Sequence, residues 1–205
     1  MGRKRVARLM RDAGVRARVC GLYRPNAANH AFFASVPNRQ RELVVQAPDQ
    51  VWFGDVTYLK VNGQWRYMAA VMDRYSRRLL AWRLSTRRDV RLTSAALNAA
   101  VARRSPAPGL VFHTDRGIEY AAYKFRDRAA RLGITQSMNR PGKMTDNAHM
   151  ESFFHSMKSD VIHGRQFHSE KELRATLKSY IDFYNRERIH SALDYVSPAT
   201  YEALA

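Results

Sequence analysis

Hydrophobic and polar positions alternate through residues 51–85 in a way that predicts three consecutive β-strands. The segment VWFGDVTYLKV (51–61) is rich in aromatic and β-branched residues, and residues 65–73 and 77–85 repeat that texture. An Asn-Gly pair at residues 62 and 63 separates the first two segments, which is a strong signal for a hairpin turn. We therefore expect an antiparallel unit of three strands.

Helical and strand patterns alternate along the rest of the chain. We expect helices at 89–104, 119–133, 148–162 and 169–193, strands at 109–114 and 134–138, and a loop at 139–147. Ser169 and Glu172 have the spacing of a capping box at the start of the last helix. Three antiparallel strands followed by alternating helices and strands predict an α/β fold, with a mixed five-stranded sheet flanked by helices.

The beginning of the chain differs in texture from this core. Residues 1–24 carry eight Arg or Lys and a single acid, and apolar residues recur there at helical spacing between Val6 and Ala13. Such a short basic helix cannot bury its own apolar face. We divide the chain into a basic helical segment at 1–24, a linker at 25–47 and a core domain at 48–203.

The amino-acid composition indicates that the chain prefers a negatively charged partner. The chain has 35 Lys and Arg against 18 Asp and Glu, a formal net charge of +17 and a pI near 10.6, which favours binding to nucleic acid. Its one cysteine, Cys20, excludes an internal disulfide and a cysteine-rich zinc site, and fits a reducing compartment. No apolar run approaches the roughly 20 residues of a membrane span.

Two aspartates occupy unusual places in the expected strands. Asp55 lies in the middle of the first strand, and Asp115 ends the fourth in the segment LVFHTDRGIEY (110–120). Each has an ordinary explanation, since Asp55 could face solvent on an edge strand and Asp115 could form a turn. If the two strands are neighbours, however, the carboxylates lie side by side and would repel unless a cation stands between them. Oxygen ligands of this kind suit Mg²⁺ or Mn²⁺.

Glu151 is the candidate for a third acidic ligand. It lies in the first turn of the expected helix 148–162, and it shares one helix face with His155 and Lys158. A carboxylate for metal followed by a lysine for phosphate is chemically reasonable, although an exposed polar stripe would look the same. Histidine ligation of a metal is disfavoured because the histidines fall in different elements without paired spacing. These histidines are His113, His149, His155, His163 and His168.

Four segments in order resemble the DDE-type transposases of insertion sequences in the IS-three group, which are related to retroviral integrases. The segments are VWFGDVTYL, FHTDRGIEY, DNAHMESFFHSMKSD and FYNRERIHSALDYVSPATYE. The resemblance covers about residues 40–203. Thirty-five residues separate Asp115 from Glu151, which is typical of the family's "D, D, 35, E" pattern. The departures are small, with His149 at a position usually small or apolar and Ile118-Glu119 in place of a Ser-Gln-like pair.

The resemblance implies an RNase H-like fold with a retroviral-integrase-like catalytic core. It implies that Asp55, Asp115 and Glu151 are the catalytic acids and bind two Mg²⁺ or Mn²⁺ ions, without another cofactor. The implied reaction is cleavage and strand transfer of DNA by two-metal phosphoryl transfer during transposition and integration. Lys158 occupies a position that contacts DNA in the family. The full set of DNA-binding candidates is Lys158, Arg116, Lys143, His155 and Arg188.

The expected partners follow from the same resemblance. They are the DNA of the element ends and the target, other copies of the chain on that DNA, and a helix-turn-helix product of an upstream reading frame. Residues 1–24 resemble the end of the helical DNA-binding region that precedes the core, so we expect the helix-turn-helix and coiled-coil parts to lie outside this chain. We expect a bacterial cytoplasmic, nucleoid-associated protein without membrane contact.

Two alternatives remain open at this point. The chain could be an RNase H-like nuclease that cuts DNA without joining it, in which case the basic segment would be surplus. It could also be a catalytically silent DNA-binding fragment of a truncated transposase, although the intact acidic triad argues against decay.

Overall fold

A mixed five-stranded sheet forms the centre of the computed structural model, which describes residues 2–15 and 27–205. The strands are β1 (Val51–Val61), β2 (Gln64–Asp73), β3 (Leu79–Ser85), β4 (Val111–Thr114) and β5 (Thr135–Met138), in the order β3-β2-β1-β4-β5. β1, β2 and β3 pair antiparallel, while β4 and β5 continue the sheet parallel to β1. The predicted sheet composition is confirmed.

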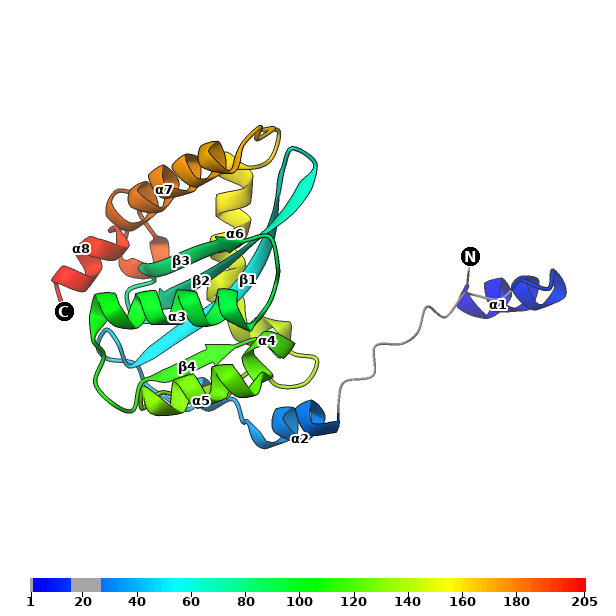
Figure 1. Cartoon of the computed structure of the whole chain (residues 1–205), viewed down its shortest axis with the longest axis horizontal. Helices are drawn as coiled ribbons and strands as arrows, with labels where there is room; N and C mark the ends of the chain where they lie inside the picture. The colour runs from blue at the N-terminus through cyan, green and yellow to red at the C-terminus, as the bar shows by residue number, and fades with distance from the viewer. Residues whose placement is uncertain (1, 16–26) are drawn as a thin grey trace.

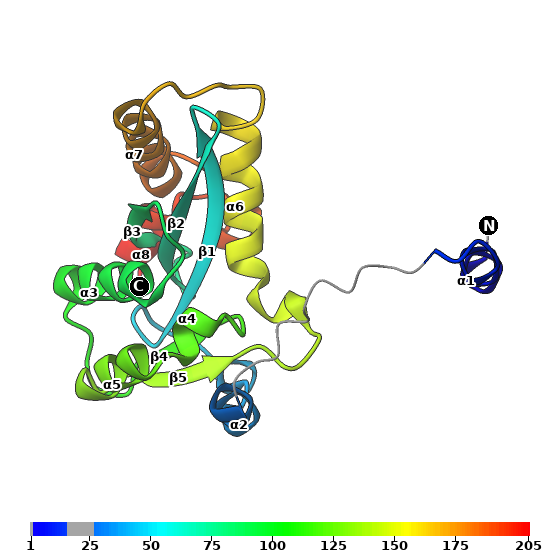
Figure 2. The same cartoon turned by 45° about the vertical axis from the view of Figure 1, so that its right-hand side comes forward.

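Helices cover both faces of this sheet. The helices of the described residues are α1 (Arg3–Asp12), which lies apart from the sheet (Figure 1), and α2 (Ala27–Ser35), α3 (Val90–Arg104), α4 (Ile118–Ala121), α5 (Tyr123–Arg131), α6 (Ala148–Val161), α7 (Glu170–Arg186) and α8 (Pro198–Ala203). Short 3₁₀ turns lie at Arg39–Arg41, Met144–Asn147 and Ser191–Leu193. Figure 1 shows the arrangement, and Figure 2 shows α6 on one side of β1 with α3 and α5 on the other.

The alternation of side chains along β1 feeds two separate hydrophobic cores. Phe53 and Leu59 pack on one face with residues of α6 and α7, such as Phe153 and Leu177. Trp52, on the opposite face, packs with residues of α3, α4 and α5. Because period two assigns neighbouring residues to opposite faces, the first strand's sequence already indicated this division.

Several element boundaries differ from the expected ones. The predicted helix at 119–133 is two helices, because Ala122 has an extended ψ of 135° between α4 and α5. The predicted helix at 169–193 ends as α7 at Arg186. α8 was not predicted. Residues 16–24 of the predicted basic segment, with Cys20, lie outside the described residues.

The predicted linker contains local structure that is attached to the core. α2 and the turn at Arg39–Arg41 both lie within residues 25–47. The backbone N–H of Arg39 donates to Ser137 Oγ at 2.9 Å, and the N–H of Met138 donates to the carbonyl of Pro37 at 3.3 Å. Arg74 also donates to the carbonyl of Gln40. This part of the predicted linker therefore docks beside β5.

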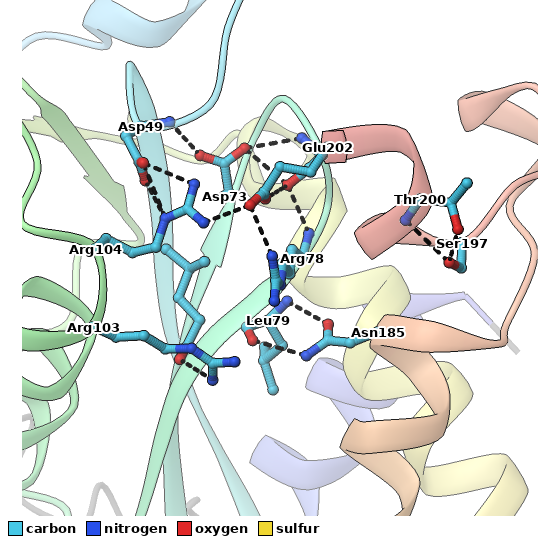
Figure 3. A network of polar contacts seen from close by, with 12 residues as sticks. Asp49, Asp73, Arg78, Leu79, Arg103, Arg104, Asn185, Ser197, Thr200 and Glu202 are labelled. Atoms are coloured by element: carbon cyan, nitrogen blue, oxygen red, sulfur yellow. Dashed lines mark hydrogen bonds and ion pairs between the residues drawn. The ribbon is translucent and has the colours of Figure 1, made fainter. Parts of the chain in front are cut away.

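A polar cluster ties α8 to the beginning of the sheet (Figure 3). The Glu202 carboxylate accepts hydrogen bonds from Ser76 Oγ, Arg78 and Arg104. Arg104, at the end of α3, also donates to Asp49 at 3.0 Å. The side chain of Asp73 accepts from the backbone N–H groups of Asp49 and Ser76. Two acids, Asp49 and Glu202, thus form ion pairs with two bases, Arg78 and Arg104, from distant segments of the chain.

Gly54 is required by the packing of β4 on β1. A Cβ atom at this position would lie 2.4 Å from Cζ of the fully buried Phe112 ring. Gly54→Ala is therefore expected to destabilise the fold by about 1–3 kcal/mol, the usual range for overpacking. Urea unfolding measures this, and Phe112→Leu in the same chain should recover part of the loss. An unchanged unfolding midpoint for Gly54→Ala would contradict the expected clash.

Candidate active site

Asp55 and Asp115 lie at the same level of two neighbouring parallel strands. β1 and β4 pair from Val51 with Val111 up to Gly54 with Thr114, so each aspartate directly follows the last residue of the β1–β4 pairing. β4 ends there, whereas β1 continues into the hairpin with β2. Both carboxylates are partly buried. The structure therefore brings together the two aspartates that the sequence singled out.

Electrostatics at this pair favour protonation or a bound cation. Burial, followed by the negative charge of Asp115 and, less strongly, that of Glu151, raises the pKa of Asp55 to about 7, against the opposing effects of the Val56 N–H and the Arg88 charge. Burial also raises the pKa of Asp115, which accepts a hydrogen bond from the N–H of Gly117 at 2.9 Å. Each carboxylate keeps oxygen lone pairs that its backbone contact does not use.

Glu151 approaches the pair from α6, the helix that packs on the Phe53 face of β1. It lies exposed in the first turn of α6, and its charge acts on Asp55. The Asn147 side chain, at the start of α6, donates to the carbonyl of Gly54 at a long 3.5 Å, which places this helix end beside Asp55. Across residues 2–15 and 27–205, no three His, Cys, Asp or Glu side chains converge closely enough to hold one ion. Glu151 thus stands near the pair without closing a three-ligand cluster.

Three of the predicted DNA-binding cations lie close to the two aspartates. Lys158, two turns beyond Glu151, places Nζ 4.4 Å from the centre of the Tyr58 ring, and burial lowers its pKa while Asp55 opposes that effect. Arg116 and Lys143 line a cleft of about 530 Å³ beside Asp115. Arg116, however, donates to the carbonyls of Asn139 and Phe33, at 2.6 Å each. It holds α2 and β5 together, so Lys143 is the more accessible cation.

The other two predicted DNA contacts lie away from that cleft. His155 is exposed on α6, one turn after Glu151. Arg188 follows α7, where its guanidinium lies 5.9 Å from the Tyr184 ring and 3.5 Å from Ser156 on α6. Neither residue lines the cleft beside Asp115.

The sequence did not reveal a group of residues that lies beside Asp115, namely Arg88, Glu119 and Tyr120. The Glu119 side chain is only 2% exposed, and its carboxylate accepts a hydrogen bond from Arg88 Nε at 2.7 Å. Arg88 also lies 3.9 Å from the Asp115 carboxylate. Tyr120 is fully buried, and both its burial and the nearby acids raise its pKa well above the ordinary value. The only signal in the sequence was Glu119 itself, an acid in an otherwise apolar segment.

Arg88 neutralises a buried carboxylate, which makes the pair testable. Arg88→Ala is expected to destabilise the protein by about 1–3 kcal/mol, because it leaves Glu119 buried without its partner. Adding Glu119→Gln should restore most of that loss, since the amide carries no charge. Chemical unfolding of the four proteins in a double-mutant cycle measures the coupling. Strictly additive effects would show that the two side chains do not depend on each other.

Two family profiles match the chain. Both are described as "Integrase core domain", and they cover residues 45–144 and 132–198. Among curated proteins, the "Transposase InsF for insertion sequence IS3A" of Escherichia coli (strain K12) is 36% identical over 201 residues. That match covers 97% of this chain and 70% of the relative. The "Transposase for insertion sequence element IS904" of Lactococcus lactis is 33% identical over 212 residues, covering 97% and 79%.

Solved structures of retroviral integrases share this fold. A chain of the simian T-cell lymphotropic virus intasome, in complex with a PP2A regulatory subunit, matches with a TM-score of 0.66 and 16% identity. The match covers 78% of this chain and 56% of that one. The HTLV-2 integrase catalytic core domain in complex with magnesium (trimeric form) matches with a TM-score of 0.62 and 14% identity, covering 78% and 99%. The predicted RNase H-like, integrase-type fold is confirmed.

Proposed function

The chain belongs to the IS3-type transposases with an integrase core domain, and from that membership we propose that Asp55, Asp115 and Glu151 catalyse DNA cleavage and strand transfer. The family supports polynucleotidyl transfer as the reaction class. The observation that carries the assignment is the position of Asp55 and Asp115 at one level of neighbouring parallel strands, each with a raised pKa. Two adjacent carboxylates of that kind repel each other, and a bound cation relieves the repulsion.

The donor set fits divalent metal in its chemistry. Asp55 and Asp115 offer hard oxygen atoms, and the like charges that raise the pKa of Asp55 are relieved by a cation between them. Glu151 would complete the set by turning its exposed side chain towards the pair. We propose two Mg²⁺ or Mn²⁺ ions held by these three residues. When bound, such ions would polarise the scissile phosphate and activate water as a nucleophile.

The chain's own residues position and neutralise the substrate. Lys158 carries its ammonium group beside the pair, on the α6 face that also bears Glu151. Lys143 offers a second cation from the rim of the cleft beside Asp115. Arg88 balances the buried charge of Glu119 beneath Asp115. The net charge of +17 gives the phosphate backbone a general attraction that weakens with rising salt.

The proposed partners are the DNA of element ends and target. Because one copy of a chain offers one such acidic site, joining two ends requires several copies on the DNA, and we propose a homo-oligomer. Titles of the HTLV-2 structures name trimeric and dimeric forms of that integrase core. None of the helices within residues 2–15 and 27–205 is long and apolar enough to cross a bilayer. We propose that the protein works at the bacterial nucleoid.

One assay tests this proposal against a simple nuclease and a silent fragment. The full chain is incubated with end-labelled duplex DNA carrying the element's terminal sequence, with a target plasmid and Mn²⁺ or Mg²⁺. Metal-dependent cleavage with covalent joining to the plasmid is the expected result. Cleavage without any joined product would favour the nuclease. Binding with neither activity, at any metal concentration, would contradict the enzyme assignment for this chain.

A further inference from the structure

The free edge of β1 carries an exposed aromatic surface next to the acidic site. β4 pairs with β1 only as far as Gly54, so from Asp55 onward the β4 side of β1 has no neighbouring strand. The hairpin of β1 and β2 continues beyond the body of the sheet (Figure 2). Tyr58 on β1 is 58% exposed and Trp65 on β2 is 47% exposed. Large aromatic side chains so open to water on a sheet need an explanation.

Each of these two rings has a lysine above it. Lys158 Nζ lies 4.4 Å from the centre of the Tyr58 ring, and Lys60 Nζ lies 4.7 Å from the centre of the Trp65 ring. The two rings stand edge to face, with their centres 5.2 Å apart. Within the described ranges 2–15 and 27–205, neither lysine forms an ion pair with a carboxylate. We call the four residues Tyr58, Lys60, Trp65 and Lys158 the aromatic strip.

We propose that the aromatic strip binds unpaired nucleotides of the DNA strand that enters the acidic site, with bases stacked on Tyr58 and Trp65. This inference rests on the proposed function and assigns a binding surface to it. The combination of aromatic faces with lysines is what a single strand needs, because bases stack and phosphates seek positive charge. A protein partner with an apolar patch would leave the two ammonium groups unpaired.

The location and spacing fit a strand anchored at Asp55. Tyr58 follows Asp55 by three residues, about 10 Å along a β-strand, and this odd separation puts its side chain on the opposite face of β1. A DNA strand that reaches both residues therefore passes over the free edge of β1, where Lys158 of α6 approaches the Tyr58 ring. Successive nucleotides of a stacked strand rise about 3.4 Å each, so the ring of Tyr58 would meet a base about three nucleotides from the reacting phosphate. A base inside a duplex is covered on both faces by its neighbours. The occupant is therefore an unpaired segment rather than an intact duplex.

Fluorescence anisotropy with the full chain in EDTA tests this surface without cleavage. The probes are a labelled blunt duplex and the same duplex with a short single-stranded extension, on either strand. Wild-type protein should bind an extended probe more tightly. Tyr58→Ala and Trp65→Ala should each weaken binding of that probe about tenfold, the effect of losing a stacked base. Tyr58→Phe should retain the wild-type affinity because it keeps the ring.

A matched control comes from another exposed tyrosine. Tyr123, which is 72% exposed on α5, lies outside the aromatic strip, and Tyr123→Ala should bind both probes with the wild-type affinity. Thermal unfolding of each variant excludes a general loss of structure. Equal affinity of wild type and both alanine variants for the extended probe would overturn the proposal. Equal weakening for blunt and extended probes would overturn base stacking, because duplex contact then explains the effect.

Trp65 also provides a direct signal of contact. Trp52 is fully buried and Trp82 packs against the core, so Trp65 is the most exposed of the chain's three tryptophans. A stacked base should quench its emission, and Trp65→Phe should abolish that quenching while preserving affinity. Failure of the proposed catalytic function would look different. Asp55→Asn would then cleave DNA like wild type, whereas the quenching and the probe preference would be unaffected.

Discussion

Asp55→Asn is expected to reduce metal-dependent DNA cleavage and joining by about 10³-fold or more, because it removes a charged oxygen ligand that would hold the ions proposed at this site. The side chain keeps its size, and β1 keeps its pairing with β4 through Gly54. DNA affinity in EDTA should therefore change little. Initial rates of cleavage on end-labelled DNA, compared with anisotropy on the same DNA, separate the two effects.

The other two acids should behave in the same way if the three act as a unit. Asp115→Asn and Glu151→Gln are each expected to lose activity to a similar extent, and the combined variant should lose little more. Asp127→Asn is the matched control, since this carboxylate forms an exposed i,i+4 pair with Arg131 on α5. If Glu151→Gln cleaves DNA at the wild-type rate, Glu151 has no catalytic role and the proposed site consists of the two aspartates alone.

Ionisation of Asp55 is expected to lower the free energy of unfolding of the metal-free protein as the pH rises from about 4 to about 7. The folded-state pKa of Asp55 is raised to about 7 from an ordinary 3.8, chiefly by burial and then by Asp115. The folded state therefore holds a proton that the unfolded state has released in this window, and stability is lost as that proton leaves. The full contribution is at most about 4 kcal/mol.

The measurement is the difference in unfolding free energy between wild type and Asp55→Asn across that pH range. Asn carries no charge at any pH, so the stability of the variant relative to wild type should increase as the pH rises. The difference is needed because buried His113, whose pKa is lowered to about 4 by burial, acts in the opposite direction and loses stability as the pH falls from about 6.5. Adding Mg²⁺ or Mn²⁺ at pH 8 should stabilise wild type and not the variant. Parallel pH curves for the two proteins would contradict the raised pKa.

Local pattern was sufficient to predict the strands and to single out the two aspartates, whose adjacency the sequence indicated only on the condition that their strands are neighbours. Period-two alternation places Trp52 and Phe53 on opposite faces of a strand, and in the structure these faces belong to two cores, with β1 and β4 as neighbours. The hairpin turn at Asn62 and Gly63 needed only two residues to be recognised. Such features depend on nearest neighbours in sequence, where propensity and periodicity carry most of the information.

What the sequence did not reveal depends on contacts between distant segments. The pairing of Arg88 with Glu119 spans 31 residues, and neither residue indicates the other by pattern. The break at Ala122 arises where α4 ends and α5 begins, although the residues around it favour a continuous helix. The attachment of α2 depends on Arg116 reaching the carbonyl of Phe33 across 83 residues. Tertiary contacts of this kind override local propensity.

The cluster around Glu202 has a consequence for the order of events while the chain is being made. Arg104 leaves the ribosome 98 residues before Glu202, which at about 5–20 residues per second is about 5–20 s of synthesis. During that interval α3 and the strands can assemble, but Arg78 and Arg104 lack their common carboxylate partner. The nascent domain would therefore carry extra positive charge at this edge until α8 has been made and Glu202 can pair with both arginines.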